Sequence, residues 1–214
     1  MKFYAEFNTD KIIREKYFQD LSYKGIIVEV GGATPEFLSM SKHFQENGWR
    51  SIIIEPNPMF AELQRQSGNE VYQYACSDEN KNNVDFTVIT KNVGAMEGVI
   101  TDHSYSSLYL KKGYSDLLKT DREYREERKI KVDVKRLGDI LDELSINNVD
   151  ILSIDTEGWE IEVMNGIDVE KTNVKLVVME NLMHYQFYTE YMESIGYTLR
   201  ERIEHNYIYT KKDQ

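Results

Sequence analysis

The strongest constraint on the fold is an alternation of short apolar runs with segments of helical spacing, which begins at residue 26. The runs at residues 26–30, 51–55 and 71–75 have the length and β-branched content of buried strands. Two segments in which apolar residues recur at helical spacing, 35–48 and 58–66, separate these runs. This βαβαβ order predicts a parallel sheet that is covered by helices on both faces.

The middle of the chain is less regular, and periodicity returns at residue 130. Residues 84–90 alternate like an exposed strand, whereas residues 91–128 mix glycine, serine, tyrosine and charge and are predicted to form a lid or substrate segment. Beyond it we expect strands at 130–134, 149–154 and 174–179, helices at 137–144 and 184–195, and closing antiparallel strands at 197–200 and 207–210.

The N-terminal residues 1–24 are predicted to be a helical extension of a single domain that spans residues 1–214. Apolar residues at helical spacing, from Ile12 to Leu21, indicate a helix that ends near Gly25, and Asp10 is its expected N-cap. A chain of 214 residues is shorter than the roughly 250 at which cores usually divide.

Charge and cysteine content exclude several classes of partner and location. The formal net charge of -11 opposes attraction to nucleic acids and to anionic membranes. The single cysteine, Cys76, cannot form an intramolecular disulfide, which favours a reducing compartment. The chain also lacks an apolar run of the ~20 residues that span a bilayer, and it starts without a signal-like segment. We therefore expect a cytoplasmic protein with a small-molecule partner and with neither nucleic acid nor membrane as a partner.

Polar residues gather where the predicted strands end, and this is the edge at which open parallel sheets bind ligands. Two glycines follow the first strand, an acidic residue ends the second, and further polar residues follow the later strands. These residues are Gly31, Gly32, Glu55, Ser77, Asp78, Asp155, Glu157 and Glu180.

The first two strand ends predict a site for a nucleoside that lacks phosphates. Gly31 and Gly32 let a ligand approach the backbone, and Glu55 can accept two hydrogen bonds from a ribose diol. The G-x-G-x-x-G fingerprint is absent, and Pro35 lacks an N–H that a pyrophosphate would use, which disfavours NAD. With the acidic Glu29 beside the turn, S-adenosylmethionine suits this site, because it combines a ribose, an ammonium and a sulfonium.

An ordered set of sequence blocks resembles the FkbM-type S-adenosylmethionine-dependent methyltransferases. VEVGGA at 28–33, IEPNP at 54–58 and ACSD at 75–78 resemble the cofactor half of that family. The later blocks follow in the family's order: SSL at 106–108, DIL at 139–141, VDILSIDTEG at 149–158, VVMEN at 177–181 and GY at 196–197. The resemblance covers residues 26–210.

The resemblance implies a Rossmann-like class I methyltransferase fold, an α/β architecture. Its sheet is mostly parallel and seven-stranded, with helices on both faces and an antiparallel C-terminal hairpin. It also implies transfer of a methyl group to a hydroxyl of a small, sugar-like or natural-product acceptor. Two alternatives remain open: an N-methyltransferase that acts on a small amine, and a non-catalytic nucleoside-binding or partner domain of the same fold. The oligomeric state is not indicated.

Under this resemblance, the cofactor-binding residues lie at the first three strand ends. Glu29 and the backbone of Gly31 and Gly32 hold the methionine end, Glu55 holds the ribose, and Cys76 and Ser77 face the adenine edge. Ala33, Pro56 and Asp155 are the other cofactor-binding candidates.

The catalytic and metal candidates lie at the later strand ends. Asp155 and Glu157 are expected where the methyl group emerges, although capping of a following helix would also explain both carboxylates. His184 is the best imidazole candidate for a base, with an ordinary surface histidine as the alternative. Asp155, Glu180 and Asn181 present oxygen atoms of the kind that suits Mg²⁺, an arrangement that cofactor binding alone also produces.

Overall fold

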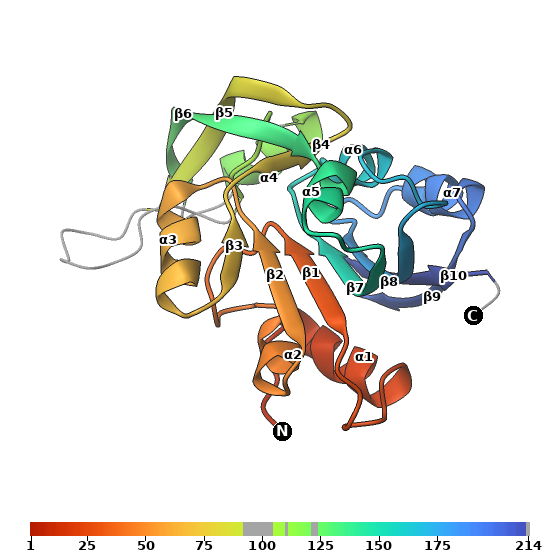
Figure 1. The fold of residues 1–214 in the computed structure, drawn as a ribbon. Helices are drawn as coiled ribbons and strands as arrows, with labels where there is room; N and C mark the ends of the chain where they lie inside the picture. Colours follow the sequence, from red (N-terminus) through yellow and green to blue (C-terminus); the bar gives the residue numbers. More distant parts are fainter. Residues whose placement is uncertain (92–104, 110, 121–123, 213–214) are drawn as a thin grey trace.

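A seven-stranded sheet forms the centre of the fold (Figure 1) in the computed structural model, which describes residues 1–91, 105–109, 111–120 and 124–212. Five strands run parallel: β1 (Ile26–Val30), β2 (Arg50–Ile54), β3 (Glu70–Tyr72), β7 (Asn148–Ile154) and β8 (Asn173–Glu180). The hairpin of β9 (Tyr197–Ile203) and β10 (Asn206–Lys211) adds to β8 in antiparallel orientation. The strand order β3-β2-β1-β7-β8-β10-β9 reverses between β1 and β7.

A second, three-stranded sheet with the order β4-β6-β5 lies beside the first (Figure 1). Its strands are β4 (Ala75–Ser77), β5 (Lys81–Lys91) and β6 (Tyr124–Arg136). β6 runs parallel to β4 and antiparallel to β5. A small core of its own, with Phe86, Val88, Val132 and Val134, lies on this sheet.

Alternation along the central strands sends apolar side chains to both faces of the large sheet. Val28 and Leu152 belong to one buried cluster, whereas their chain neighbours Ile27 and Ile151 belong to another. The first cluster is covered by α5 (Leu137–Glu143), α6 (Glu160–Asn165) and α7 (Gln186–Ser194), and the second by α1 (Thr9–Lys16) and α2 (Lys42–Glu46). The remaining helices are η1 (Glu6–Asn8), α3 (Pro58–Gln66) and α4 (Lys112–Thr120).

This architecture confirms the predicted fold class: a mostly parallel seven-stranded sheet with helices on both faces and antiparallel C-terminal strands. Helix α3 has the predicted bounds, with Pro58 as its first residue and the Asn57 side chain accepting from the Met59 N–H. Among the described residues, no helix is long and apolar enough to cross a membrane.

The N-terminal helix is shorter than its apolar spacing predicts. It ends at Lys16 instead of near Gly25. Tyr17 and Phe18 still pack against the second buried cluster, whereas Leu21 is exposed. Asp10 is not the N-cap, which is Asn8. Asp10 is buried inside the helix and its carboxylate accepts hydrogen bonds from the Tyr4 and Lys11 N–H groups, thereby fixing the chain that leads into α1.

The prediction of a helix over residues 35–48 is wrong for its first half, since α2 begins only at Lys42. The carboxylate of Glu29 accepts hydrogen bonds from the backbone of residues 40 and 41 and from the Ser39 hydroxyl. These bonds hold the chain in a non-helical turn, and Phe37 is left exposed.

Two other segments are divided differently from the prediction. The expected strand at residues 71–75 ends at Tyr72, and Ala75 already belongs to the second sheet. The segment 91–128 contains α4 and the start of β6, which begins at Tyr124 instead of residue 130. Residues 92–104, 110 and 121–123 of that segment lie outside the described residues, and its role as a lid or substrate segment stays a prediction.

Candidate functional site

A cavity of about 300 Å³ lies beyond the carboxyl ends of β1, β2 and β7, where the strand order reverses. The second sheet lines its other side through Ala75, Cys76 and Phe86. Parallel sheets bind ligands at this position because the loops diverge there. Nine of the predicted site residues line the cavity: Glu29, Gly31, Gly32, Ala33, Glu55, Pro56, Cys76, Asp155 and Glu157.

The glycine turn after β1 is packed against the loop after β7. Gly31 has φ +86°, and a Cβ atom at this position would lie 1.8 Å from the carbonyl oxygen of Asp155. A Cβ atom at Gly32 would lie 2.4 Å from Cγ2 of Ile53. Both positions therefore require glycine, and the buried Gln64 fixes the turn by donating to the Gly32 carbonyl at 2.7 Å.

Glu55 is a buried carboxylate held by backbone donors at the second strand end. One oxygen accepts from the Ala33 N–H at 2.9 Å and the other from the Asn57 N–H at 2.7 Å. Burial, and to a smaller extent the charge of Glu29, raises the pKa of Glu55 to about 7. Because each carboxylate oxygen can accept a second hydrogen bond, Glu55 can still receive the two hydroxyl groups of a ribose.

Glu29 lines the cavity, yet its carboxylate is already bonded to the turn before α2. It accepts from the Met40 N–H at 2.8 Å and from the Ser41 N–H and Ser39 hydroxyl at 3.2 Å. Burial raises the pKa of Glu29, and these hydrogen bonds oppose that shift. The residue therefore shapes the wall of the cavity as well as contributing charge to it.

β4 of the second sheet and the residues near it supply an apolar wall. Cys76 is buried, and burial raises the pKa of its thiol to about 12, so it remains protonated at neutral pH. Phe60 and Tyr74 line the cavity on the same side, which provides the apolar surroundings that a flat purine ring requires. Ser77 is buried and its hydroxyl donates to Asp78.

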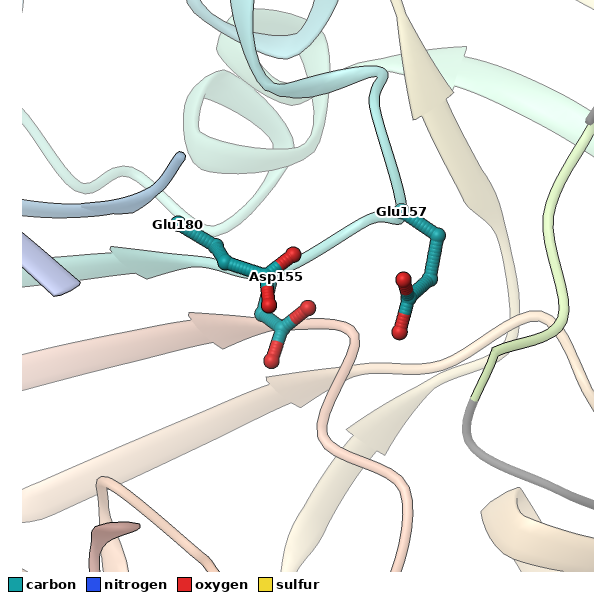
Figure 2. Close-up of side chains that lie close together, drawn as sticks. All are labelled: Asp155, Glu157 and Glu180. Carbon is teal, nitrogen blue, oxygen red and sulfur yellow. The ribbon is translucent and has the colours of Figure 1, made fainter. Parts of the chain in front are cut away.

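Three carboxyl groups converge at the ends of β7 and β8: Asp155, Glu157 and Glu180 (Figure 2). One oxygen atom from each of them lies within 4.8 Å of the other two. Asp155 is exposed to the cavity, whereas Glu157 and Glu180 are buried. This cluster gathers three carboxyl groups at one wall of the cavity.

The surroundings raise the pKa of all three groups. The pKa of Asp155 is raised to about 7. The larger cause is desolvation in the recess where Asp155 lies, and the next is the charge of Glu160. Burial and the neighbouring carboxylates shift the pKa of Glu157 and of Glu180 well upward. A hydrogen bond between the Asp155 and Glu180 side chains lowers the pKa of Asp155 and raises that of Glu180.

Comparison with known protein families identifies the family to which the chain belongs. The family profile described as the Methyltransferase FkbM domain matches residues 29–206, which is most of the sequence. The chain belongs to the FkbM methyltransferase family. Among curated proteins, none matches it.

The crystal structure of methyltransferase FkbM from Methylobacillus flagellatus is similar in fold to this FkbM methyltransferase chain. The two share 13% sequence identity with a TM-score of 0.50, and the match covers 91% of this chain and 46% of that chain. The chain therefore spans about half the length of that protein. At this identity the similarity concerns the fold.

Four predicted residues of this FkbM chain are not part of the cavity lining: Ser77, Glu180, Asn181 and His184. The Asn181 side chain accepts from the Tyr185 N–H and donates to the Tyr185 carbonyl, so both ends of its amide hold the turn before α7. His184 has φ +52°, and its Nδ1 lies 3.1 Å from the Tyr207 hydroxyl. Its role as a base stays a prediction.

Several residues of the site in this FkbM chain carry no recognisable signal in the sequence. Glu6 and Asn206 line the cavity although one precedes α1 and the other begins the last strand. Phe37 and Leu38 line it from the turn that Glu29 holds. The block at 106–108 did carry a signal, since its resemblance to the family marked it before the structure placed Ser106, Ser107 and Leu108 at the cavity.

Proposed function

We propose that this FkbM-family chain transfers a methyl group from S-adenosylmethionine to a hydroxyl of a small, sugar-like or natural-product acceptor. The observation that carries the proposal is one cavity with two kinds of wall. One wall has the glycine turn and the bidentate acceptor Glu55, and the other has the carboxyl groups of Asp155 and Glu157.

The first wall fits S-adenosylmethionine, which supplies an electrophilic methyl group when bound. The glycine turn has no side chain at Gly31 or Gly32, so ligand atoms can contact the backbone there. Glu55 offers its remaining lone pairs to the ribose, and Cys76 lies among apolar residues suited to the adenine. The charge of Asp155 and its neighbours attracts a cationic cofactor.

The second wall fits the acceptor. A hydroxyl group has to lose its proton as the new O–C bond forms, so a proton acceptor must lie within hydrogen-bond reach. Asp155 faces the cavity, and its pKa of about 7 suits proton transfer at neutral pH. The chain otherwise has to align the hydroxyl with the methyl group and exclude water.

Calorimetric titration with S-adenosylhomocysteine tests the cofactor site. We expect micromolar binding that Glu55→Gln weakens about tenfold or more, equivalent to about 1.4 kcal/mol. Glu62→Gln, on the exposed face of α3, is the matched control and should leave binding unchanged. Absence of both heat and a thermal shift in the wild type would contradict the proposal.

A transfer assay tests the acceptor class. Hydroxylated sugars and matched amino sugars are incubated with protein and methyl-labelled S-adenosylmethionine, and the methylated atom is identified by NMR. We expect methyl ethers. Label found only on nitrogen would show the amine alternative instead.

A further inference from the structure

We propose that Asp155, Glu157 and Glu180 bind one divalent metal cation at the wall of the cavity (Figure 2). The cation site itself does not depend on methyl transfer, whereas its effect on an acceptor, given below, rests on the proposed function. All three ligands are carboxylate oxygens, which favour hard cations of the Mg²⁺, Mn²⁺ and Ca²⁺ type.

The sheet itself brings the first two ligands together. Ile154 of β7 pairs with Met179 of β8 in parallel register, so the next residue of each strand, Asp155 and Glu180, stands beside the other. The three oxygen atoms lie within 4.8 Å of one another. Opposite ligands of a hard cation are separated by about 4–5 Å, twice the metal–oxygen distance, so the cluster is of the right size.

Glu157 supplies the observation that points to a missing ligand. Only 4% of the residue is exposed, and its Oε2 is buried without a hydrogen-bond partner among the described residues. Its carboxyl group lies to one side of the Asp155 and Glu180 carboxyl groups (Figure 2), with one oxygen within 4.8 Å of an oxygen of each. A buried polar atom without a partner costs about 1–3 kcal/mol, and more when it is charged, so a site that leaves it unpaired is incomplete.

The loop that contains Glu157 is held by hydrogen bonds to another carboxylate, that of Glu160. Glu160 accepts from the Thr156 and Gly158 N–H groups through one oxygen and from the Tyr188 hydroxyl through the other. Glu160 is thereby satisfied by protein donors and holds the turn in which Glu157 has φ +57°. Of the two glutamates at residues 157 and 160, Glu160 is thus used for structure and Glu157 is left open toward the cavity.

Protein cations do not balance the charge of the cluster. Within the described part of the chain, no lysine or arginine forms an ion pair with any of the three ligands. The nearest basic side chain given by the structure is the imidazole of His205, whose Nε2 lies 3.9 Å from Glu180 but 2.7 Å from Glu6. The Tyr114 hydroxyl donates to Glu180 at 3.4 Å without adding charge.

The structure also changes the ligand set that the sequence predicts. Asn181 uses its side-chain oxygen for the Tyr185 N–H, whereas the open oxygen belongs to Glu157. Under the proposed function, a cation held by the three carboxylates would make an acceptor hydroxyl that contacts it more acidic. Asp155 would contact the cation through one oxygen, and its other oxygen would take the hydroxyl proton while the O–CH₃ bond forms and the S–CH₃ bond breaks.

Manganese titration of the full chain, stripped of metal, tests the site by the loss of the free Mn²⁺ EPR signal. We expect one Mn²⁺ per chain with submillimolar affinity, displaced by Mg²⁺. Glu157→Gln and Glu180→Gln should each weaken binding about tenfold or more. Asp142→Asn, which removes a carboxylate paired with Lys171 on the surface, is the control and should bind normally.

A second readout does not depend on the folding of those variants. Trp159 lines the same cavity, so Tb³⁺ bound to the cluster should emit when tryptophan is excited, and Trp159→Phe should lower this emission although Trp49 remains. The proposal is overturned if Mn²⁺ binding is not saturable, or if folded Glu157→Gln and Glu180→Gln proteins bind as tightly as the wild type. Because S-adenosylhomocysteine binding is measured separately, failure of the cation site is distinguished from failure of the proposed function.

Discussion

Gly31 is fixed by two separate constraints, its left-handed backbone and its contact with the Asp155 carbonyl. Gly31→Ala should therefore destabilise the protein by more than the roughly 1 kcal/mol that positive φ costs an alanine, and should weaken S-adenosylhomocysteine binding. Gly68→Ala is the matched control, since Gly68 has φ +79° with nothing within 4 Å of the added atom. Urea unfolding measures the stability of both variants. Equal losses of unfolding free energy would show that the contact with the Asp155 carbonyl does not matter.

Glu55 gives stability a pH dependence with a defined sign. Its pKa is raised from 4.5 to about 7 in the folded chain, so the folded state binds the proton more tightly than the unfolded state. Its contribution is therefore largest below the unfolded pKa and is lost as pH rises from 4.5 to about 7. The loss is at most about 3 kcal/mol.

The difference between wild type and Glu55→Gln isolates this contribution from the other titrating groups. Unfolding free energies of both proteins are measured by urea titration across this pH window. We expect the wild type to lose stability relative to the variant as pH rises. A constant offset between the two curves would contradict the assigned pKa.

The elements most readily predicted from sequence are those whose pattern is set by burial on both faces. The segments that form β1, β7 and β8 are short apolar runs because both faces of the sheet are covered, so their positions follow from the sequence. The turn at 35–41 could not be predicted, since its conformation is set by Glu29, a residue on another element. The pairing of β4 with β6 likewise joins segments far apart in the chain.

In the candidate site, too, some residues can be predicted from the sequence and others cannot. Gly31, Glu55 and Asp155 were found because strand ends of a parallel sheet meet at one edge. The hydrogen bonds by which Glu29 and Asn181 hold turns could not be predicted in this way. Short-range sequence patterns do not reveal with which backbone groups a side chain will form hydrogen bonds. Sequence thus locates the edge of the sheet, and tertiary hydrogen bonds decide which carboxylates remain open.

The turn before α2 should loosen when Glu29 loses one acceptor oxygen. In Glu29→Gln the amide nitrogen cannot accept, so the bond from either the Met40 N–H or the Ser41 N–H is lost, at a local cost of about 1–3 kcal/mol. Hydrogen exchange should become at least about tenfold faster at one or both of these amides. Glu36→Gln, an exposed neighbour paired only weakly with Lys2, is the control. Unchanged protection would mean that other contacts hold the turn.

Taken together, the charges of the molecule favour a cationic ligand over a neutral one. The chain has a net charge of -11, and three carboxyl groups gather at one wall of its cavity. S-adenosylmethionine carries a sulfonium charge that S-adenosylhomocysteine lacks, so under the proposed function the acidic wall attracts the substrate form of the cofactor more than the product form.

Salt should therefore weaken the binding of S-adenosylmethionine more than that of S-adenosylhomocysteine. Charges within roughly the Debye length of about 10 Å at 0.1 M salt attract the sulfonium, and added salt screens the more distant ones. We expect the affinity for S-adenosylmethionine to fall more steeply with sodium chloride than that for S-adenosylhomocysteine, as measured by parallel calorimetric titrations at constant pH. Glu157→Gln should reduce the difference, because it removes one ionisable group from the acidic wall without changing the size of the side chain. Equal salt slopes in the wild type would mean that the sulfonium lies away from the acidic wall, and the roles proposed for Asp155 and Glu157 in methyl transfer would then be wrong.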